Sequence, residues 1–170
     1  LFLDIDTLDR GDLDLAGLRA TLPAWIFRET GTGNTAEQSR QADIIVSNKV
    51  TLDADIITAA ANLKLICIAA TGTNNVDLAA AAERGVTVCN VRSYATASVV
   101  EHVFCLVLCL RRSLPQYLQA VEHAGWQEST TFCMLDYPIV ELAGRTLGII
   151  GCGELGSAVA TTGKAFGMQV

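Results

Sequence analysis

The sequence predicts an α/β fold in which helices cover both faces of a parallel β-sheet. Short apolar runs recur along the first half of the chain between polar turns, and some are rich in Ile and Val, as expected for strands buried on both faces. Segments with helical signals separate the runs, and this alternation is typical of parallel sheets. The runs lie at residues 1–5, 25–27, 44–47, 63–69 and 86–89.

The spacers between these runs carry the helix signals. Leucines recur at a near-helical period in the first spacer. Thr35 and Thr51 each precede a predicted helix, and a threonine hydroxyl can accept a hydrogen bond from a free first-turn N–H group. Gly85 follows the last of these helices, and glycine is favoured just past helix ends. The predicted helices span residues 13–22, 36–42, 53–61 and 77–84.

The second half begins with a long predicted helix over residues 98–112. It is apolar almost all round, so we expect it to be buried between layers or against a partner. A second helix and an irregular loop follow over 113–143. A new α/β unit then begins at Gly144, with a strand, a helix that ends at Gly167, and the start of another strand. Because a βαβ unit needs its second strand, we expect a fragment of a longer protein. The strand and helix lie at 145–150 and 155–166, and the new strand begins at 168–170.

Composition excludes several classes of protein. Of the 170 residues, 51% are hydrophobic, which is enough to fill one core and argues against disorder, collagen and coiled coil. The 12 basic and 18 acidic residues give a net charge of −6 with no basic run, so we expect neither a nucleic-acid nor an anionic-membrane partner. The longest apolar run, 103–110, is far short of the roughly 20 residues that cross a bilayer.

The six cysteines lie mostly inside apolar stretches. Free cysteine behaves there as a small buried hydrophobe. The chain opens without a basic segment ahead of an apolar one, so we expect no signal peptide. These features favour the cytoplasm.

The sharpest motif is the glycine pattern of residues 151–156, which follows a predicted strand and opens a predicted helix. That context is typical of dinucleotide binding. Gly151 permits a tight turn, Gly153 leaves room for a pyrophosphate, and Gly156 lets helix and strand pack closely. The phosphates would lie at the positive end of the helix. A glycine-rich turn without nucleotide is the alternative.

The cofactor's 2′ preference cannot be read from this pattern. The acidic residue that binds the ribose is expected about 20 residues after the motif. Val170 lies only 14 residues after Gly156 (170 − 156). NAD is our expectation, and NADP is not excluded.

Four stretches in this order and spacing resemble the D-isomer-specific 2-hydroxyacid dehydrogenases, and within them the glycerate dehydrogenase (hydroxypyruvate reductase) and phosphoglycerate dehydrogenase branch. The resemblance covers essentially the whole chain. Four motifs in register are far more specific than one glycine loop. The stretches are residues 70–77 (ATGTNNVD), 84–90 (RGVTVCN), 96–102 (TASVVEH) and 147–156 (LGIIGCGELG).

The resemblance implies a flavodoxin-like substrate domain over residues 1–96, followed by the first, incomplete part of a Rossmann NAD-binding domain over 97–170. It implies hydride transfer between NAD and a small D-2-hydroxy or 2-keto acid such as glycerate or hydroxypyruvate. The long apolar helix would form a homodimer.

The resemblance also places two loops beside the substrate. Both follow predicted strands, where open parallel sheets form their binding crevice. Backbone N–H groups in such turns can hold a carboxylate. Lys49 adds a positive charge, or is merely solvated. The predicted substrate residues are Asn48, Lys49, Val50, Thr71, Gly72 and Thr73.

Cofactor contacts are implied at the glycine loop and at one threonine that precedes the long helix. The family's catalytic Arg, Glu and His lie beyond the glycine loop, so we expect no catalytic residue in this chain. His102, Cys105 and Cys109 share a helical face, but three ligands on one helix fit a tetrahedral metal site poorly, and we expect core packing. The predicted cofactor residues are Thr96, Gly151, Gly153, Glu154, Leu155 and Gly156.

Two other functions stay open at this point. The same fold family includes corepressors that use a dinucleotide to control association, so a dinucleotide-sensing binding module is the alternative to an enzyme. A gene fragment without function is the third possibility. An intact catalytic trio in a longer chain would favour the enzyme.

Overall fold

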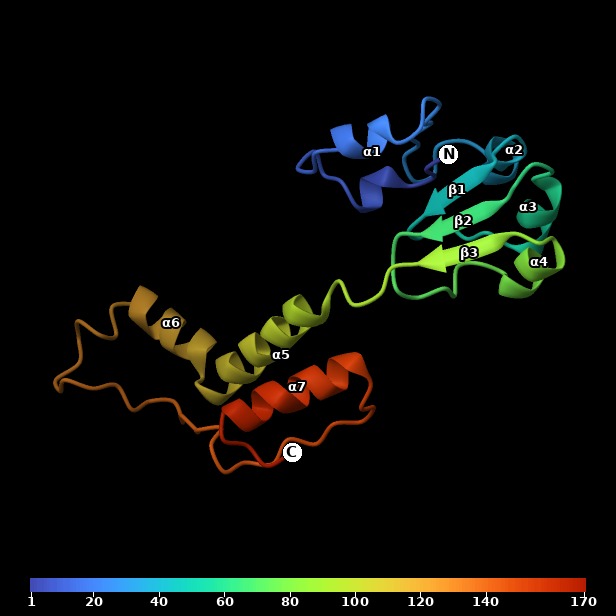
Figure 1. The fold of residues 1–170 in the computed structure, drawn as a ribbon. Helices are drawn as coiled ribbons and strands as arrows, with labels where there is room; N and C mark the ends of the chain where they lie inside the picture. Colours follow the sequence, from blue (N-terminus) through green and yellow to red (C-terminus); the bar gives the residue numbers. More distant parts are fainter. The chain divides into compact units, whose positions relative to one another are not determined.

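A computed structural model describes residues 1–170, and the chain divides into two compact units, Leu1–Arg92 and Ser93–Val170 (Figure 1). The first unit contains the β-sheet, and the second is built mainly from helices. They divide between Arg92 and Ser93, close to the expected boundary at residues 96 and 97. The roles of the two units as substrate and NAD-binding domains stay predictions.

The sheet has three parallel strands in the order β1-β2-β3. Ile45 of β1 pairs with Ile66 of β2, which pairs in turn with Val88 of β3. Three of the predicted apolar runs are thereby confirmed as strands: the first has the predicted ends, and the ends of the other two are shifted by one or two residues. The strands are β1 (Ile44–Ser47), β2 (Leu65–Ile68) and β3 (Thr87–Asn90).

The first two predicted strands are reduced to single bridge residues. Phe2 pairs in parallel with Phe27 on one side and with Val46 of β1 on the other. The chain then leaves the sheet and enters a short 3-10 turn, η1 (Ile5–Thr7). The prediction of a strand over residues 1–5 was therefore too long. The resulting order, with the first segment between the second and β1, is that of a flavodoxin-like sheet.

Three short helices connect and cover the strands, and each has a side-chain cap. Asn34 caps α2, and Asp53 caps α3 through a 2.9 Å hydrogen bond from the Ile56 N–H. The predicted caps, Thr35 and Thr51, were wrong, because Thr35 is itself the first residue of α2 and Asp53, not Thr51, directly precedes α3. The helices are α2 (Thr35–Ser39), α3 (Ala54–Ala59) and α4 (Leu78–Glu83), the last capped by Asp77 and followed by Gly85 at φ +69°.

The core of the first unit lies on one face of the sheet. Alternate residues of β1 and β2 are buried, as the two-residue period of a strand requires. Ile57 of α3 and Ala81 of α4 pack into the same cluster, so these helices cover that face. The predicted first helix is shorter than expected, as α1 (Ala16–Ala20), and has no buried residue.

The second unit packs α7 (Glu154–Ala165) against α5 (Thr96–Arg111). The Phe104 and Phe166 rings stack with centroids 5.1 Å apart. The predicted second helix is present as α6 (Leu114–Glu122).

The predicted strands at 145–150 and 168–170 meet in one parallel bridge, between Thr146 and Gln169. The Leu147 N–H donates to the Gln169 carbonyl at 2.7 Å, and the Gln169 N–H donates to the Arg145 carbonyl at 2.8 Å. Since α7 connects the two segments, they form the βαβ unit that the sequence predicted, with pairing over only these few residues.

The apolar helix α5 is not buried within the chain as expected. Phe104 is its one buried residue, and Leu106 and Leu110 are 51% and 77% exposed. Covering by a partner stays a prediction. No helix of the chain is long and apolar enough to cross a membrane.

All six cysteines are free, but the expectation that they lie buried was wrong for four of them. Those four are exposed because they lie on helix and loop surfaces or on the outer strand β3. They are Cys89, Cys105, Cys133 and Cys152.

Candidate functional site

The loop after β1 is fixed by a buried carboxylate from the start of the chain. Asp4 is fully buried, and its two oxygens accept hydrogen bonds from the Asn48 N–H at 2.9 and 3.1 Å. The N–H groups of Lys49 and Val50 donate to the same carboxylate at 2.5 and 3.0 Å. These backbone N–H groups bind a carboxylate, as expected for such a turn, but the carboxylate belongs to Asp4 and not to a substrate.

Three side chains brace the same loop. The Ser47 hydroxyl donates to the Val50 carbonyl at 2.9 Å, and the Asn75 amide donates to that carbonyl at 3.1 Å. The Asn48 amide donates to the Thr7 hydroxyl at 2.9 Å. Lys49 is the only exposed residue among residues 47–50. A substrate contact at residues 48–50 stays a prediction, and it now depends on the Lys49 ammonium rather than on the backbone.

The loop after β2 is arranged in the opposite way. The backbone N–H groups of Thr71, Gly72 and Thr73 donate no hydrogen bond within the chain. The loop is held instead through its carbonyls: Thr71 accepts from the Asn90 amide at 2.8 Å, and Thr73 accepts from the Val76 N–H at 3.1 Å. These three donors lie at the carboxyl end of a parallel strand, where they are free for an anionic ligand.

A cavity elsewhere in the first unit is not part of this site. It measures about 400 Å³ and lies beside Leu1, Ile26 and Ile44. Ile44 is the first residue of β1, so the cavity lies at the opposite end of the strand from residues 48–50.

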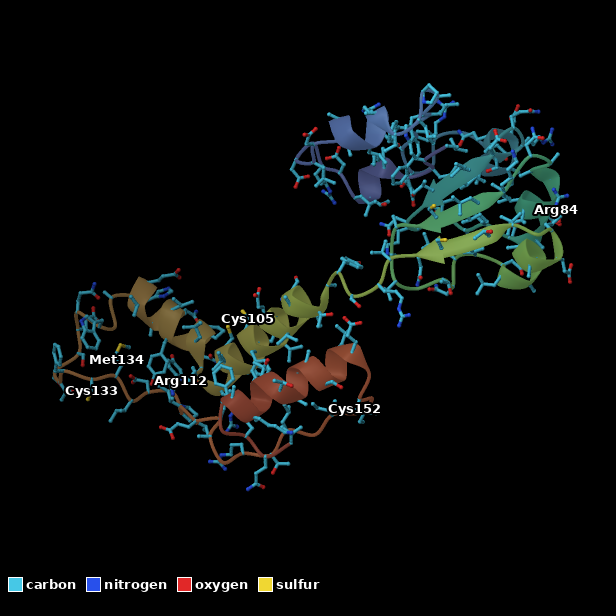
Figure 2. The ribbon with its side chains drawn as sticks, in the orientation of Figure 1. Arg84, Cys105, Arg112, Cys133, Met134 and Cys152 are labelled. Carbon is cyan, nitrogen blue, oxygen red and sulfur yellow. The ribbon has the colours of Figure 1, made fainter.

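The glycine loop of the second unit has the geometry that its sequence predicted. Gly151 has φ +94°, which side-chain-bearing residues rarely adopt. A Cβ at Gly156 would lie 2.0 Å from the Gly151 carbonyl oxygen and 3.3 Å from the Ile149 side chain, so only glycine allows this contact between helix and strand. A Cβ at Gly153 would meet no atom within 4 Å, which leaves room beside the backbone. Figure 2 shows Cys152 in this loop, where it enters α7.

The first turn of α7 is open to a ligand. Its N-cap, Gly153, has no side chain, and the N–H groups of Leu155 and Gly156 donate no hydrogen bond within the chain. A helix N-terminus carries a partial positive charge and favours anions such as phosphate. The residues present therefore fit a dinucleotide pyrophosphate.

Among the predicted cofactor residues, Glu154 differs in that its side chain is already hydrogen bonded within the chain. Its carboxylate accepts hydrogen bonds from the Ser93 hydroxyl, at 2.8 Å, and from the Thr96 hydroxyl. These contacts tie the glycine loop to the start of α5, and they bring Thr96 and Glu154 together. Cofactor contact by either side chain stays a prediction.

Sequence reasoning missed Asp4, Ser93, Asn75 and Asn90, which hold the loops through hydrogen bonds within the chain. Asp4 had a usable signal, since a carboxylate inside an apolar run is expensive to bury unless it is hydrogen bonded. The other three are ordinary polar residues in loops or at strand ends, where sequence gives no such signal.

Comparison with known proteins agrees with these features. The sequence model of the D-isomer specific 2-hydroxyacid dehydrogenase catalytic domain matches residues 12–166. A glycerate dehydrogenase of Methylorubrum extorquens is 47% identical over 134 residues, which cover 79% of this chain and 43% of that protein. A hydroxypyruvate reductase of Blautia hydrogenotrophica is 33% identical over 171 residues, covering 99% of this chain and 53% of that protein.

A solved structure gives the same result for the fold. The D-lactate dehydrogenase of Aquifex aeolicus, complexed with NAD and lactic acid, superposes with a TM-score of 0.73 at 26% identity, covering 91% of this chain and 46% of that one. The chain spans about half the length of the relatives it matches. The family match over most of its residues establishes that the chain belongs to the D-isomer-specific 2-hydroxyacid dehydrogenases.

Proposed function

We propose that the protein to which this chain belongs is an NAD-dependent oxidoreductase that interconverts a small D-2-hydroxy acid and its 2-keto acid, with glycerate and hydroxypyruvate as the favoured pair. The carrying observation is the glycine loop, in which Gly156 packs closely on Gly151 and the N-cap Gly153 leaves the N-terminus of α7 without a side-chain cap. The names of the relatives support the choice of substrate.

The residues of this chain would bind and orient. The N–H groups of Leu155 and Gly156 would hold the pyrophosphate, and those of residues 71–73 would hold the substrate carboxylate. Lys49 would add a positive charge near that carboxylate. The bound nicotinamide supplies the hydride chemistry, and the protein supplies position and charge.

A titration of the 170-residue chain with NADH tests this proposal. The amide signals of residues 151–156 should shift in an NMR spectrum, and NADPH should perturb them more weakly. Unchanged signals would refute dinucleotide binding by this loop.

We expect no turnover of hydroxypyruvate by the 170-residue chain alone. Loss of NADH absorbance when the chain, NADH and hydroxypyruvate are mixed would contradict that expectation. None of the features above favours a dinucleotide sensor over an enzyme.

The protein is proposed to be a homodimer through the apolar faces of α5 and α6. Leu110 and Leu118 are 77% and 57% exposed on these helices, and burying such side chains against a second copy would stabilise an interface. Light scattering coupled to gel filtration measures the oligomeric state. Leu110→Glu should yield a monomer, and an unchanged mass would exclude this interface.

The cytoplasm is the proposed compartment, because six free thiols persist best in a reducing environment. In protein isolated from its source and alkylated before digestion, peptide mass spectrometry should find these six cysteines alkylated, as free thiols are; a disulfide between any two of them would contradict the proposal.

A further inference from the structure

Asp4 is an acidic side chain in the interior with no cation beside it. The side chain is fully buried, and the salt bridge present in the chain joins two other residues, Lys64 and Asp43, at 3.2 Å. A buried carboxylate is costly unless hydrogen bonds replace its lost hydration. Three successive backbone N–H groups, those of residues 48–50, provide these bonds.

The position of Asp4 in the sheet explains why it reaches this loop. Phe2 pairs with Val46 of β1, so the chain runs beside β1 in the same direction. Asp4 follows Phe2 by two residues, just as Asn48 follows Val46. The carboxyl ends of two neighbouring parallel segments are thus joined by a side chain of one and the backbone of the other.

We propose that Asp4 is a positioning residue for the substrate loop: it fixes the backbone of residues 48–50 so that Lys49 presents its ammonium group to the substrate carboxylate. The inference depends on the function proposed above. Lys49 is the only charged side chain in residues 48–50 and 71–73. Because its own N–H is bonded to Asp4, the backbone that carries the ammonium group cannot turn freely.

Amide hydrogen exchange on the 170-residue chain tests the positioning. In the wild type, the amides of Lys49 and Val50 should be protected. Asp4→Asn keeps the shape but removes the charge, and it should speed their exchange at least about tenfold, since hydrogen bonds to charged groups are among the stronger ones.

Asp43→Asn is the matched control, because Asp43 is an exposed carboxylate of the same unit, and there the exchange of residues 48–50 should not change. The Ala69 amide, which donates to the Ser47 carbonyl at 2.9 Å, reports whether the sheet is still folded. Rapid exchange of Lys49 and Val50 in the wild type would overturn the proposal without any variant. Equal protection in Asp4→Asn with Ala69 protected would also overturn it.

A titration with hydroxypyruvate, followed at the amides of residues 71–73, tests the link to Lys49. Asp4→Asn and Lys49→Met should each weaken binding about three- to tenfold, and the double variant should bind no more weakly than Lys49→Met alone, because residues that act through one another are not additive. Additive losses would show that Asp4 does not act through Lys49.

If the wild type fails to bind hydroxypyruvate, the substrate function proposed for these loops is refuted, and with it the role of Asp4 toward substrate. The exchange experiment then still decides whether Asp4 fixes the loop, so the two failures are distinguishable.

Discussion

The two units differ in how much apolar surface they bury. The first has a continuous core that includes Ile45, Ile57 and Ile66, each with 0% exposure. In the second, only Phe104 and Leu142 are buried among the large apolar residues. The glycine loop nevertheless has its expected geometry, so local constraints such as the fit of Gly156 on Gly151 determine its shape without a large core beneath it.

The two units also differ in how their helix N-termini are capped. In the first unit, Asn34, Asp53 and Asp77 cap α2, α3 and α4 with their side chains, and the short α1 has no side-chain cap. In the second, α5, α6 and α7 have no side-chain cap. A cap satisfies the free N–H groups of the first turn, so a helix that is to bind phosphate there is better left without one.

The largest expected effect tests the difference in apolar burial between the two units. The same change, Ile to Ala, is made once in each unit. Ile66→Ala should lower the free energy of unfolding by about 2–5 kcal/mol, because it leaves a cavity in a close-packed core. Ile150→Ala should change it by no more than about 0.5 kcal/mol, since Ile150 is fully exposed. Urea unfolding measures both.

Tryptophan fluorescence can follow each unit separately, because Trp25 lies in the first unit and Trp126 in the second. Ile66→Ala is therefore made in a Trp126→Phe background, where Trp25 alone fluoresces, and Ile150→Ala is made in a Trp25→Phe background. Each double variant is compared with its own background protein. If both variants lost a similar amount of unfolding free energy, Ile150 would have to be buried, which would contradict its exposure in the structure.

The next effect concerns the glycine contact. Gly156→Ala places a methyl group against the Gly151 carbonyl and should destabilise the loop by about 1–3 kcal/mol, as overpacking does, with a weaker NADH affinity. Gly148→Ala is the control, because a Cβ there meets no atom within 4 Å. Calorimetric titration measures the affinity. Equal Kd values for the two variants would contradict the assigned role of Gly156.

A smaller effect is expected at the helix caps. Asp53→Ala removes the acceptor for the Ile56 N–H and should cost about 1 kcal/mol of stability. Asp55→Ala, in the first turn of the same helix, loses only its interaction with the helix dipole and should cost a few tenths of that. Urea unfolding followed through Trp25 distinguishes them, and equal costs would argue against capping by Asp53.

The smallest effect is on thiol reactivity. Burial raises the pKa of the Cys67 thiol, and the neighbouring Cys89, its partner in register on β3, raises it further. A raised pKa means less thiolate at a given pH, so alkylation of Cys67 should need a higher pH than that of the exposed Cys133. Peptide mass spectrometry after iodoacetamide treatment from pH 7 to 9 measures this. Faster alkylation of Cys67 than of Cys133 at pH 7 would contradict it.

The sequence was sufficient for the features that depend on local pattern. Ile- and Val-rich runs identified β1 and β2, and the glycine spacing identified the turn at Gly151 and the contact at Gly156. The helix ends were less predictable, because Thr35 and Asn34 are both good capping residues and only the backbone geometry selects one.

Long-range placement was beyond sequence reasoning. The run at residues 1–5 has strand composition, yet Phe2 alone forms bridges, and the Asp4 carboxylate in this run is engaged by amides more than forty residues away. The availability of N–H groups likewise cannot be read from composition. Residues 48–50 and 71–73 gave the same prediction, and only the fold separates the occupied donors from the free ones.

The 44-residue separation between Asp4 and Asn48 also affects the chain while it is being synthesised. Ribosomes add about 5–20 residues per second, so about 2–9 seconds pass before the backbone N–H groups that bind the Asp4 side chain have been synthesised. Phe2 and Leu3, buried in the finished unit, remain uncovered for the same interval. Contacts between distant residues also form slowly. The segment that contains Phe2 and Asp4 therefore joins the sheet late, and until then its apolar side chains stay exposed to solvent.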